Sequence, residues 1–185
     1  GFEAPTKIQS IAIPKIFSGK DIVATAQTGT GKTAAFGLPL LQKITSRKLP
    51  PSSPRSPRSL ILAPTRELAL QILEDLESFS GNSKISFSCV IGGINQNSQI
   101  RKNSHGIDVL IAAPGRLLDL VNQGHIRLDQ TEFLVLDECD RLLDMGFLPD
   151  VKRIIKTMPK KRQSVLFSAT IPEDVRQFSR EILSK

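Results

Sequence analysis

A glycine-rich octapeptide near the N-terminus has the residue types that bind the phosphates of a nucleotide. An expected strand at residues 21–25 precedes it and an apolar helical segment follows, which is the context that a phosphate loop requires. Glycines let the backbone turn its N–H groups inward, and a helix N-terminus adds the positive end of its dipole. Lys32 is suited to the β- and γ-phosphates, and the Thr33 hydroxyl to Mg²⁺. The predicted phosphate loop comprises Ala26, Gln27, Thr28, Gly29, Thr30, Gly31, Lys32 and Thr33.

This octapeptide departs from two general nucleotide-binding patterns. The pattern G-x-x-x-x-G-K-[ST] has glycine where this chain has Ala26, and Ala34 replaces the last glycine of a dinucleotide fingerprint G-x-G-x-x-G. A tight turn without a ligand would explain the glycines, but it would not explain Lys32 and Thr33 directly behind them. Phosphate binding is therefore the prediction.

Two acidic residues directly follow a later apolar run. Residues 133–136 are Phe-Leu-Val-Leu, and Asp137 and Glu138 come next. In open α/β sheets, ligands lie at the carboxyl ends of the strands. We expect Asp137 to hold Mg²⁺, partly through water, and Glu138 to orient or deprotonate the attacking water. Two acids that only end a strand and cap a helix are common, but with an upstream phosphate loop they predict nucleotide hydrolysis.

Short apolar runs alternate with amphipathic segments along the whole chain, which predicts an α/β domain with a mostly parallel central sheet and helices on both faces. The expected strands are rich in Val, Ile and Leu and hardly alternate with polar residues, as in strands covered on both faces. They span residues 21–25, 59–63, 85–91, 108–112, 133–136 and 164–167. Helical apolar stripes run through Leu68, Ile72, Leu73, Leu76 and Phe79; through Phe147, Val151, Ile154, Ile155 and Met158; and through Val175, Phe178 and Ile182.

The composition fits one globular domain over residues 1–185. The chain is 39% hydrophobic and carries a net charge of +7. Its longest apolar runs are much shorter than the about 18 residues that a membrane-spanning helix needs. The first residues do not resemble a signal peptide, so we expect an intracellular protein with no membrane partner.

Cys89 and Cys139 lack metal-ligand spacing and are expected to be buried thiols. Residues 46–58, rich in proline, serine and basic residues, predict a mobile surface loop.

Seven short blocks, in order from the first residue to near the last, make the chain resemble the first RecA-like domain of the DEAD-box ATP-dependent RNA helicases of superfamily 2. The N-terminal residues 1–9 are similar to the Q motif, and residues 26–33 to the family's phosphate loop. The other blocks are Pro64-Thr65-Arg66-Glu67-Leu68-Ala69 (motif Ia), Gly92-Gly93, Pro114-Gly115-Arg116 (motif Ib), Asp137-Glu138-Cys139-Asp140 (motif II, in a DECD form) and Ser168-Ala169-Thr170 (motif III).

The resemblance implies a role for each block. Gln9 would read the edge of adenine through its side-chain amide and so favour ATP. Backbone N–H groups and arginines would hold RNA phosphates with little sequence preference. Asp140, Ser168 and Thr170 would couple the nucleotide site to RNA. The implied catalytic residues are Lys32, Asp137 and Glu138, and the implied RNA-binding residues are Pro64, Thr65, Arg66, Gly92, Gly93, Pro114, Gly115 and Arg116.

Three residues depart from the family pattern. Cys139 replaces the alanine of Asp-Glu-Ala-Asp, Ala113 replaces a threonine before Pro114, and Lys7 stands where proline is common. The cysteine keeps a small apolar side chain, so we expect activity to survive. The alanine removes one possible hydroxyl contact to RNA.

Family members also have a second RecA-like domain, and the chain stops soon after motif III. We therefore expect a monomeric N-terminal half of a longer helicase that uses ATP and Mg²⁺. This half by itself is expected to bind nucleotide but not to unwind RNA. The expected location is cytoplasmic, or nuclear in a eukaryote. Two alternatives are a P-loop hydrolase that acts on no nucleic acid and a non-catalytic binding module. Motif Ia, the glycine doublet and motif Ib argue against the first alternative. The intact residues of the ATP site oppose the second.

Overall fold

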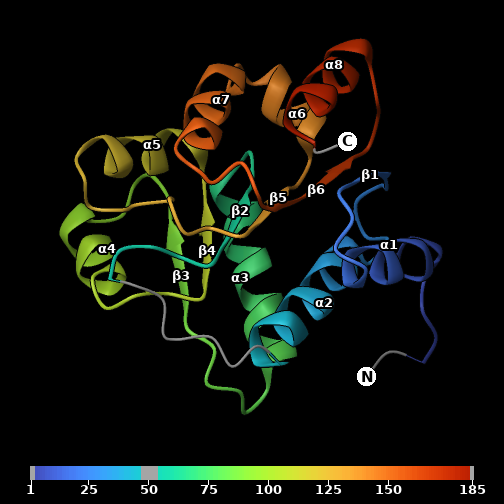
Figure 1. The fold of residues 1–185 in the computed structure, drawn as a ribbon, viewed down its shortest axis with the longest axis horizontal. Coiled ribbons are helices and arrows are strands. Elements are labelled where there is room, and N and C mark those ends of the chain that lie inside the picture. Colours follow the sequence, from blue (N-terminus) through green and yellow to red (C-terminus); the bar gives the residue numbers. More distant parts are fainter. Residues whose placement is uncertain (1–2, 47–53, 184–185) are drawn as a thin grey trace.

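Six parallel strands form one central sheet in the structure, a computed structural model that describes residues 3–46 and 54–183 (Figure 1). The strand order is β1-β6-β5-β2-β4-β3, and every neighbouring pair is parallel, which confirms the predicted sheet. Each predicted strand is present, with ends shifted by a few residues at most. The strands are β1 (Ile22–Thr25), β2 (Ser59–Leu62), β3 (Phe87–Val90), β4 (Val109–Ala112), β5 (Phe133–Leu136) and β6 (Gln163–Ser168).

A helix follows each of the six strands, and the helices cover both faces of the sheet (Figure 1). The three predicted apolar stripes lie along α3, α7 and α8, although Met158 is buried just beyond the end of α7. Helix α4 is absent from the predicted helices because Ile100 is its only apolar residue, which leaves no periodic stripe. The helices are α1 (Lys7–Phe17), α2 (Lys32–Ser46), α3 (Arg66–Ser80), α4 (Gln96–Asn103), α5 (Pro114–Asn122), α6 (Cys139–Asp144), α7 (Leu148–Lys156) and α8 (Glu173–Ile182).

Two hydrophobic cores lie on opposite faces of the sheet. Helices α1, α2 and α3 pack on one face, and α5 to α8 pack on the other. Strand β2 contributes to both, because Ile61 points into the first core while Leu60 and Leu62 point into the second. Alternate residues of a strand face opposite sides, so a strand covered on both faces needs apolar residues throughout. This two-sided packing holds the strand ends in place.

The remaining sequence predictions concern the two cysteines, the loop at residues 46–58 and membrane-spanning helices. Cys139 is buried and Cys89 is half-buried, and burial raises the thiol pKa to about 12 and about 11, respectively. In the predicted loop at residues 46–58, residues 47–53 lie outside the described part of the chain, and residues 54–58 form no helix or strand. Along the described ranges, no helix has both the length and the apolar character needed to cross a membrane.

Candidate nucleotide site and adjoining edge

The register of the sheet brings the carboxyl ends of all six strands to one level. Thr25 pairs with Ser168, and Leu62 pairs with both Leu136 and Ala112. Parallel strands present their carboxyl ends at the same edge, so the residues that follow them form a continuous row. Every segment predicted to bind nucleotide or RNA, except the Q-motif segment, directly follows one of these strand ends or lies a few residues beyond it.

The glycine-rich loop links β1 to α2 as predicted. Gly29 and Gly31 have φ angles of 80° and 83°, in the left-handed region that favours glycine. The Thr30 hydroxyl donates to the Gln27 carbonyl at 2.7 Å and tightens the turn. Helix α2 begins at Lys32, so its first N–H groups and its positive dipole end face the loop. The loop therefore has the backbone geometry of an anion site.

The N-terminal Q-motif segment packs directly on this loop. The Gln9 amide group is buried, accepts from the Thr6 N–H at 2.9 Å and donates to the Gly31 carbonyl at 3.2 Å. The Thr6 hydroxyl caps α1 and also donates to the Thr30 carbonyl at 2.9 Å. A Cβ atom on Gly31 would lie 2.5 Å from Gln9 Nε2, so a side chain there would displace Gln9. Gln9 therefore supports the phosphate loop, a contact that its predicted role at adenine does not include.

Lys32 and Asp137 meet at the centre of the row, from α2 and from the end of β5. Lys32 Nζ lies 3.4 Å from Asp137 Oδ1, and both side chains are buried. Burial raises the pKa of the Asp137 carboxyl, against the opposing effects of Lys32 and of the Glu138 N–H. Mg²⁺ binds one or two carboxylates together with nucleotide phosphates, so a threonine hydroxyl and one carboxylate suit the ion, and the lysine suits the phosphates. Lys32, Thr33 and Asp137 thus fit a magnesium nucleotide.

Glu138 lies in a strained turn between β5 and α6. Its backbone angles, φ 48° and ψ 54°, are left-handed, which costs a non-glycine residue about 1–3 kcal/mol. Its N–H donates to Asp137 Oδ1 at 2.9 Å, and its Oε2 accepts from Arg141 Nη1 at 2.8 Å. The strain is concentrated at the residue predicted to act on the attacking water.

Asp140, Ser168 and Thr170 form one hydrogen-bonded cluster, although Asp140 and Thr170 are 30 residues apart. The N–H and the hydroxyl of Thr170 donate to Asp140 Oδ2 at 3.0 and 2.9 Å. The Asp140 N–H donates to Ser168 Oγ at 3.0 Å. Burial alone would raise the pKa of Asp140, but hydrogen bonds involving Thr170, Ser168 and the Arg141 N–H together lower it. The cluster ties the acidic motif that follows β5 to the end of β6.

The segments predicted to contact RNA lie farther along the same row, after β2, β3 and β4. Thr65 caps α3 by accepting from the Leu68 N–H at 3.2 Å. Arg66 Nη1 donates to the Gly92 carbonyl at 3.5 Å, which joins motif Ia to the glycine doublet. Arg116 Nη1 donates to Gln96 Oε1 at 3.2 Å and so links α5 to α4. The structure thus places Pro64, Thr65, Arg66, Gly92, Gly93, Pro114, Gly115 and Arg116 on one edge.

Gln99 holds the glycine doublet in position and is absent from the sequence predictions. Its buried amide accepts from the Ile91 N–H at 3.0 Å and donates to the Ile91 carbonyl at 3.1 Å. It also donates to the Ile94 carbonyl at 3.2 Å, so it closes the turn from both sides. The residue that it holds, Ile91, directly precedes Gly92. A glutamine within a polar helical segment carries no sequence signal for this role.

Replacing Gln99 by leucine should lower the free energy of unfolding by about 2–4 kcal/mol, because the buried N–H and carbonyl of Ile91 lose their partners. Urea denaturation followed by circular dichroism measures the change. Gln123→Leu is the matched control, since the exposed Gln123 amide meets Gln96 where water can replace it. Equal midpoints for the two variants would show that Gln99 does not hold this turn.

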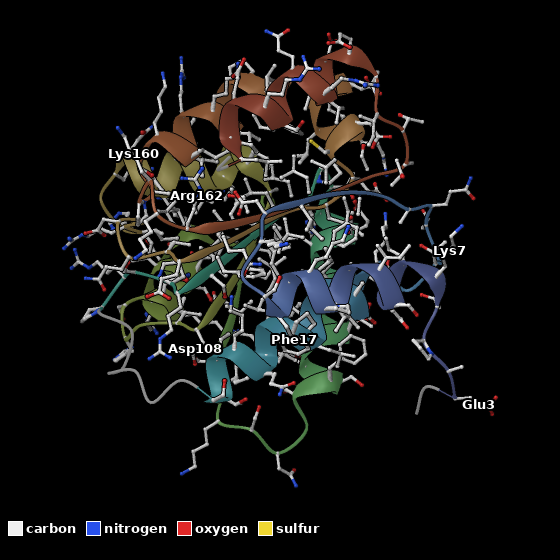
Figure 2. The ribbon with its side chains drawn as sticks, turned by 45° about the vertical axis from the view of Figure 1, so that its right-hand side comes forward. Glu3, Lys7, Phe17, Asp108, Lys160 and Arg162 are labelled. Carbon is white, nitrogen blue, oxygen red and sulfur yellow. The ribbon has the colours of Figure 1, made fainter. Side chains whose placement is uncertain are left out.

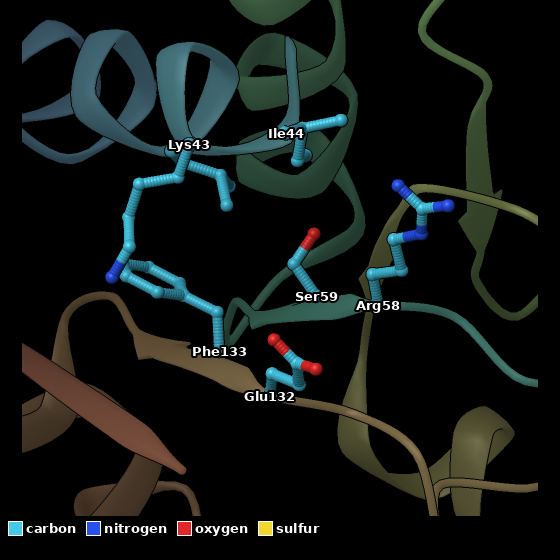
Figure 3. A pocket seen from close by; sticks show the side chains of 7 residues that line it. Lys43, Ile44, Arg58, Ser59, Glu132 and Phe133 are labelled. Atoms are coloured by element: carbon cyan, nitrogen blue, oxygen red, sulfur yellow. The ribbon is translucent and has the colours of Figure 1, made fainter. Parts of the chain in front are cut away.

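The hollow beside the phosphate loop has a volume of about 680 Å³, room for a nucleotide. Its lining comes from the Q-motif segment, the phosphate loop and the end of β6: Thr6, Lys7, Ile8, Ile11, Thr25, Ala26, Gln27, Thr30 and Ala169. A smaller cavity of about 50 Å³ lies at the opposite edge of the sheet, where Lys43 and Phe133 line it (Figure 3). That edge holds the amino ends of β2 and β5, so this cavity is separate from the nucleotide site.

Comparisons with known proteins agree with this geometry. A family model described as DEAD/DEAH box helicase matches residues 6–178. The chain is 45% identical over 184 residues to the ATP-dependent RNA helicase dbp3 of Aspergillus terreus, covering 99% of this chain and 37% of that protein. It is also 45% identical to dbp2 of Emericella nidulans, covering 100% of this chain and 32% of that protein.

Among solved structures, a DEAD box protein from the hyperthermophile Methanococcus jannaschii matches with a TM-score of 0.91 and 35% identity. The match covers 100% of this chain and 49% of that one. The chain thus spans 32% and 37% of the lengths of the two fungal relatives. Its fold is that of a RecA-like domain with an all-parallel sheet. The chain belongs to the DEAD/DEAH box helicase family.

Proposed function

We propose that residues 1–185 are the first RecA-like, ATP-binding domain of an ATP-dependent RNA helicase. The observation that carries the proposal is the pairing of Lys32 with Asp137 behind a loop whose two glycines adopt left-handed angles. The two fungal relatives are named ATP-dependent RNA helicases, which supports the same function. In the intact protein, ATP binding and hydrolysis would be coupled to RNA binding and local duplex opening.

On the nucleotide side, each residue has a chemical role. Gln9 reads adenine while it supports the loop, since its amide has one donor and one acceptor position beyond the bonds described above. The loop N–H groups and Lys32 hold the phosphates, and Thr33 and Asp137 hold Mg²⁺, partly through water. The bound ion would screen the charge on the phosphate oxygens. Glu138, which is buried, orients or deprotonates the attacking water.

On the RNA side, the row after β2, β3 and β4 contacts the sugar–phosphate backbone. Arginines and backbone N–H groups at this edge bind phosphates without reading bases, so sequence preference would be small. The cluster of Asp140, Ser168 and Thr170, which links the ends of β5 and β6, would couple this row to the nucleotide site. The proposed RNA-binding residues are Pro64, Thr65, Arg66, Gly92, Gly93, Pro114, Gly115 and Arg116.

The proposed function needs a second RecA-like domain, which would lie in the part of the longer relatives that this chain does not match. In related phosphoryl-transfer enzymes, arginines supplied from outside the phosphate loop are worth about 10³–10⁵ in rate. We therefore propose that this chain is a monomer that binds ATP or ADP but turns ATP over very slowly and does not unwind RNA. A cytoplasmic or nuclear location fits an RNA substrate.

The proposal is tested by titrating the chain with fluorescent ADP and Mg²⁺. Lys32→Ala should weaken binding by about 10- to 100-fold, since it removes a charge-assisted hydrogen bond worth about 1.5–3 kcal/mol. Lys160→Ala removes the same charge from an exposed loop, which Figure 2 shows on the opposite side of the view from Lys7. This variant should bind ADP as tightly as the parent chain does. Equal affinity in both variants would refute the phosphate loop, provided that circular dichroism shows both to be folded.

A further inference from the structure

The surface of α4 carries positive charge without compensating acids. Between Glu77 and Asp108 the sequence contains no aspartate or glutamate. The basic side chains of this stretch include Arg101 and Lys102, in the last turn of α4. Both are exposed, and neither forms a salt bridge within residues 3–46 and 54–183. This charge is therefore available to a polyanion.

A hollow of about 560 Å³ lies along this charged surface, which we call the α4 surface. Asn97 and Arg101 lie one helical turn apart, as do Ser98 and Lys102, so amide, hydroxyl and cationic groups form two neighbouring rows. The lining residues are Asn95, Asn97, Ser98, Arg101 and Lys102. None is aromatic, so the surface suits the phosphates and sugars of a strand better than stacked bases.

The α4 surface continues directly from the glycine doublet. On the buried side of α4, Gln99 bonds to Ile91 and Ile94, on either side of Gly92 and Gly93. Gln96, at the start of α4, accepts from Arg116. The helix is therefore tied both to the doublet and to motif Ib. A strand held at the doublet would meet a surface already fixed in position.

We propose that the α4 surface is an additional binding surface for the backbone of single-stranded RNA, extending the path beyond Gly92 and Gly93. The inference rests on the proposed RNA-binding function and adds residues that none of the motifs contains. Arg101 would bind a phosphate through its planar guanidinium, and Lys102 would bind a neighbouring phosphate as a point charge. Asn97 and Ser98 would donate to phosphate or sugar oxygens.

The test compares two double variants that remove equal charge. Arg101→Gln/Lys102→Gln changes the α4 surface, and Lys160→Gln/Lys161→Gln changes exposed lysines in the loop before β6. Fluorescence anisotropy with labelled oligouridylate at several KCl concentrations gives the affinity and its salt dependence. The α4 variant should bind about tenfold more weakly. The magnitude of its slope of log affinity against log salt should decrease by about 1.4, since two phosphate contacts are lost and each contributes about 0.7 on a single strand.

Reference measurements separate this inference from the proposed function. Arg66→Gln should weaken RNA binding through motif Ia, and the α4 variant should keep the parent affinity for fluorescent ADP, which shows that its fold is intact. If Arg66→Gln weakens binding while the α4 variant matches the loop variant, the α4 surface is refuted and the proposed function stands. If the parent chain binds ADP but no oligouridylate, both the proposed RNA interface and the α4 surface fail.

Discussion

Replacing Glu138 by glutamine in the longer helicase that we propose should lower the rate of ATP hydrolysis by about 10²–10⁴-fold. Glutamine has nearly the same size but cannot take a proton from the attacking water. The buried Glu138 follows Asp137 directly and is held by Arg141 at 2.8 Å, so its carboxylate has a defined position beside the candidate magnesium site. Steady-state phosphate release with saturating RNA measures the rate.

Nucleotide affinity separates a catalytic from a structural role for Glu138. Fluorescent ADP should bind Glu138→Gln about as well as the parent protein, because the phosphate loop and Lys32 are unchanged. Glu173→Gln removes an acid whose side chain is 72% exposed, and it should hydrolyse ATP at the parent rate. A Glu138→Gln protein with full activity would exclude the proposed role in activating water.

Replacing Phe167 by alanine should lower the free energy of unfolding by about 3–5 kcal/mol, the range for removing a fully buried aromatic side chain. Phe167 has an exposed fraction of 0% and lies on β6, where its ring meets that of Phe36 from α2 at a centroid distance of 5.7 Å. Urea denaturation followed by circular dichroism gives the loss.

Phe17→Ala is the matched control for this substitution. Phe17, at the end of α1, is 44% exposed, so the same truncation should cost well under half as much (Figure 2). The next residue after Phe167 is Ser168, which accepts from the Asp140 N–H. A loss at Phe167 no larger than that at Phe17 would show that the packing of β6 against α2 does not hold the end of this strand.

Much of the fold was predictable because local sequence carries it. Strand β5, Phe133–Leu136, is continuously apolar and is followed by two acids, so its bounds agree with the prediction. The phosphate loop was predictable because glycine adopts the left-handed angles seen at Gly29 and Gly31 without the strain that other residues incur there. Helix α4 was not predictable, since its single apolar residue leaves no period and tertiary bonds from Gln99 hold it.

The contacts within the site could not be read from local pattern. Gln9 bonds to Gly31 across 22 residues, and Thr170 bonds to Asp140 across 30. Similarly, Arg66 reaches Gly92 only because β2 and β3 end at the same edge, on either side of β4. A motif names the residues but does not specify which atoms meet, because that depends on strand order and register.

The sequence by itself determined the parallel sheet, the phosphate loop and the order of the motifs, because these depend on apolar runs, glycine angles and residue types that are local in the chain. Only the tertiary structure decided that Gln9 supports the loop, that Lys32 faces Asp137 and that Gln99 holds the glycine doublet. These contacts form because the two hydrophobic cores fix the sheet in one strand register. A register is a property of paired strands and not of any one segment.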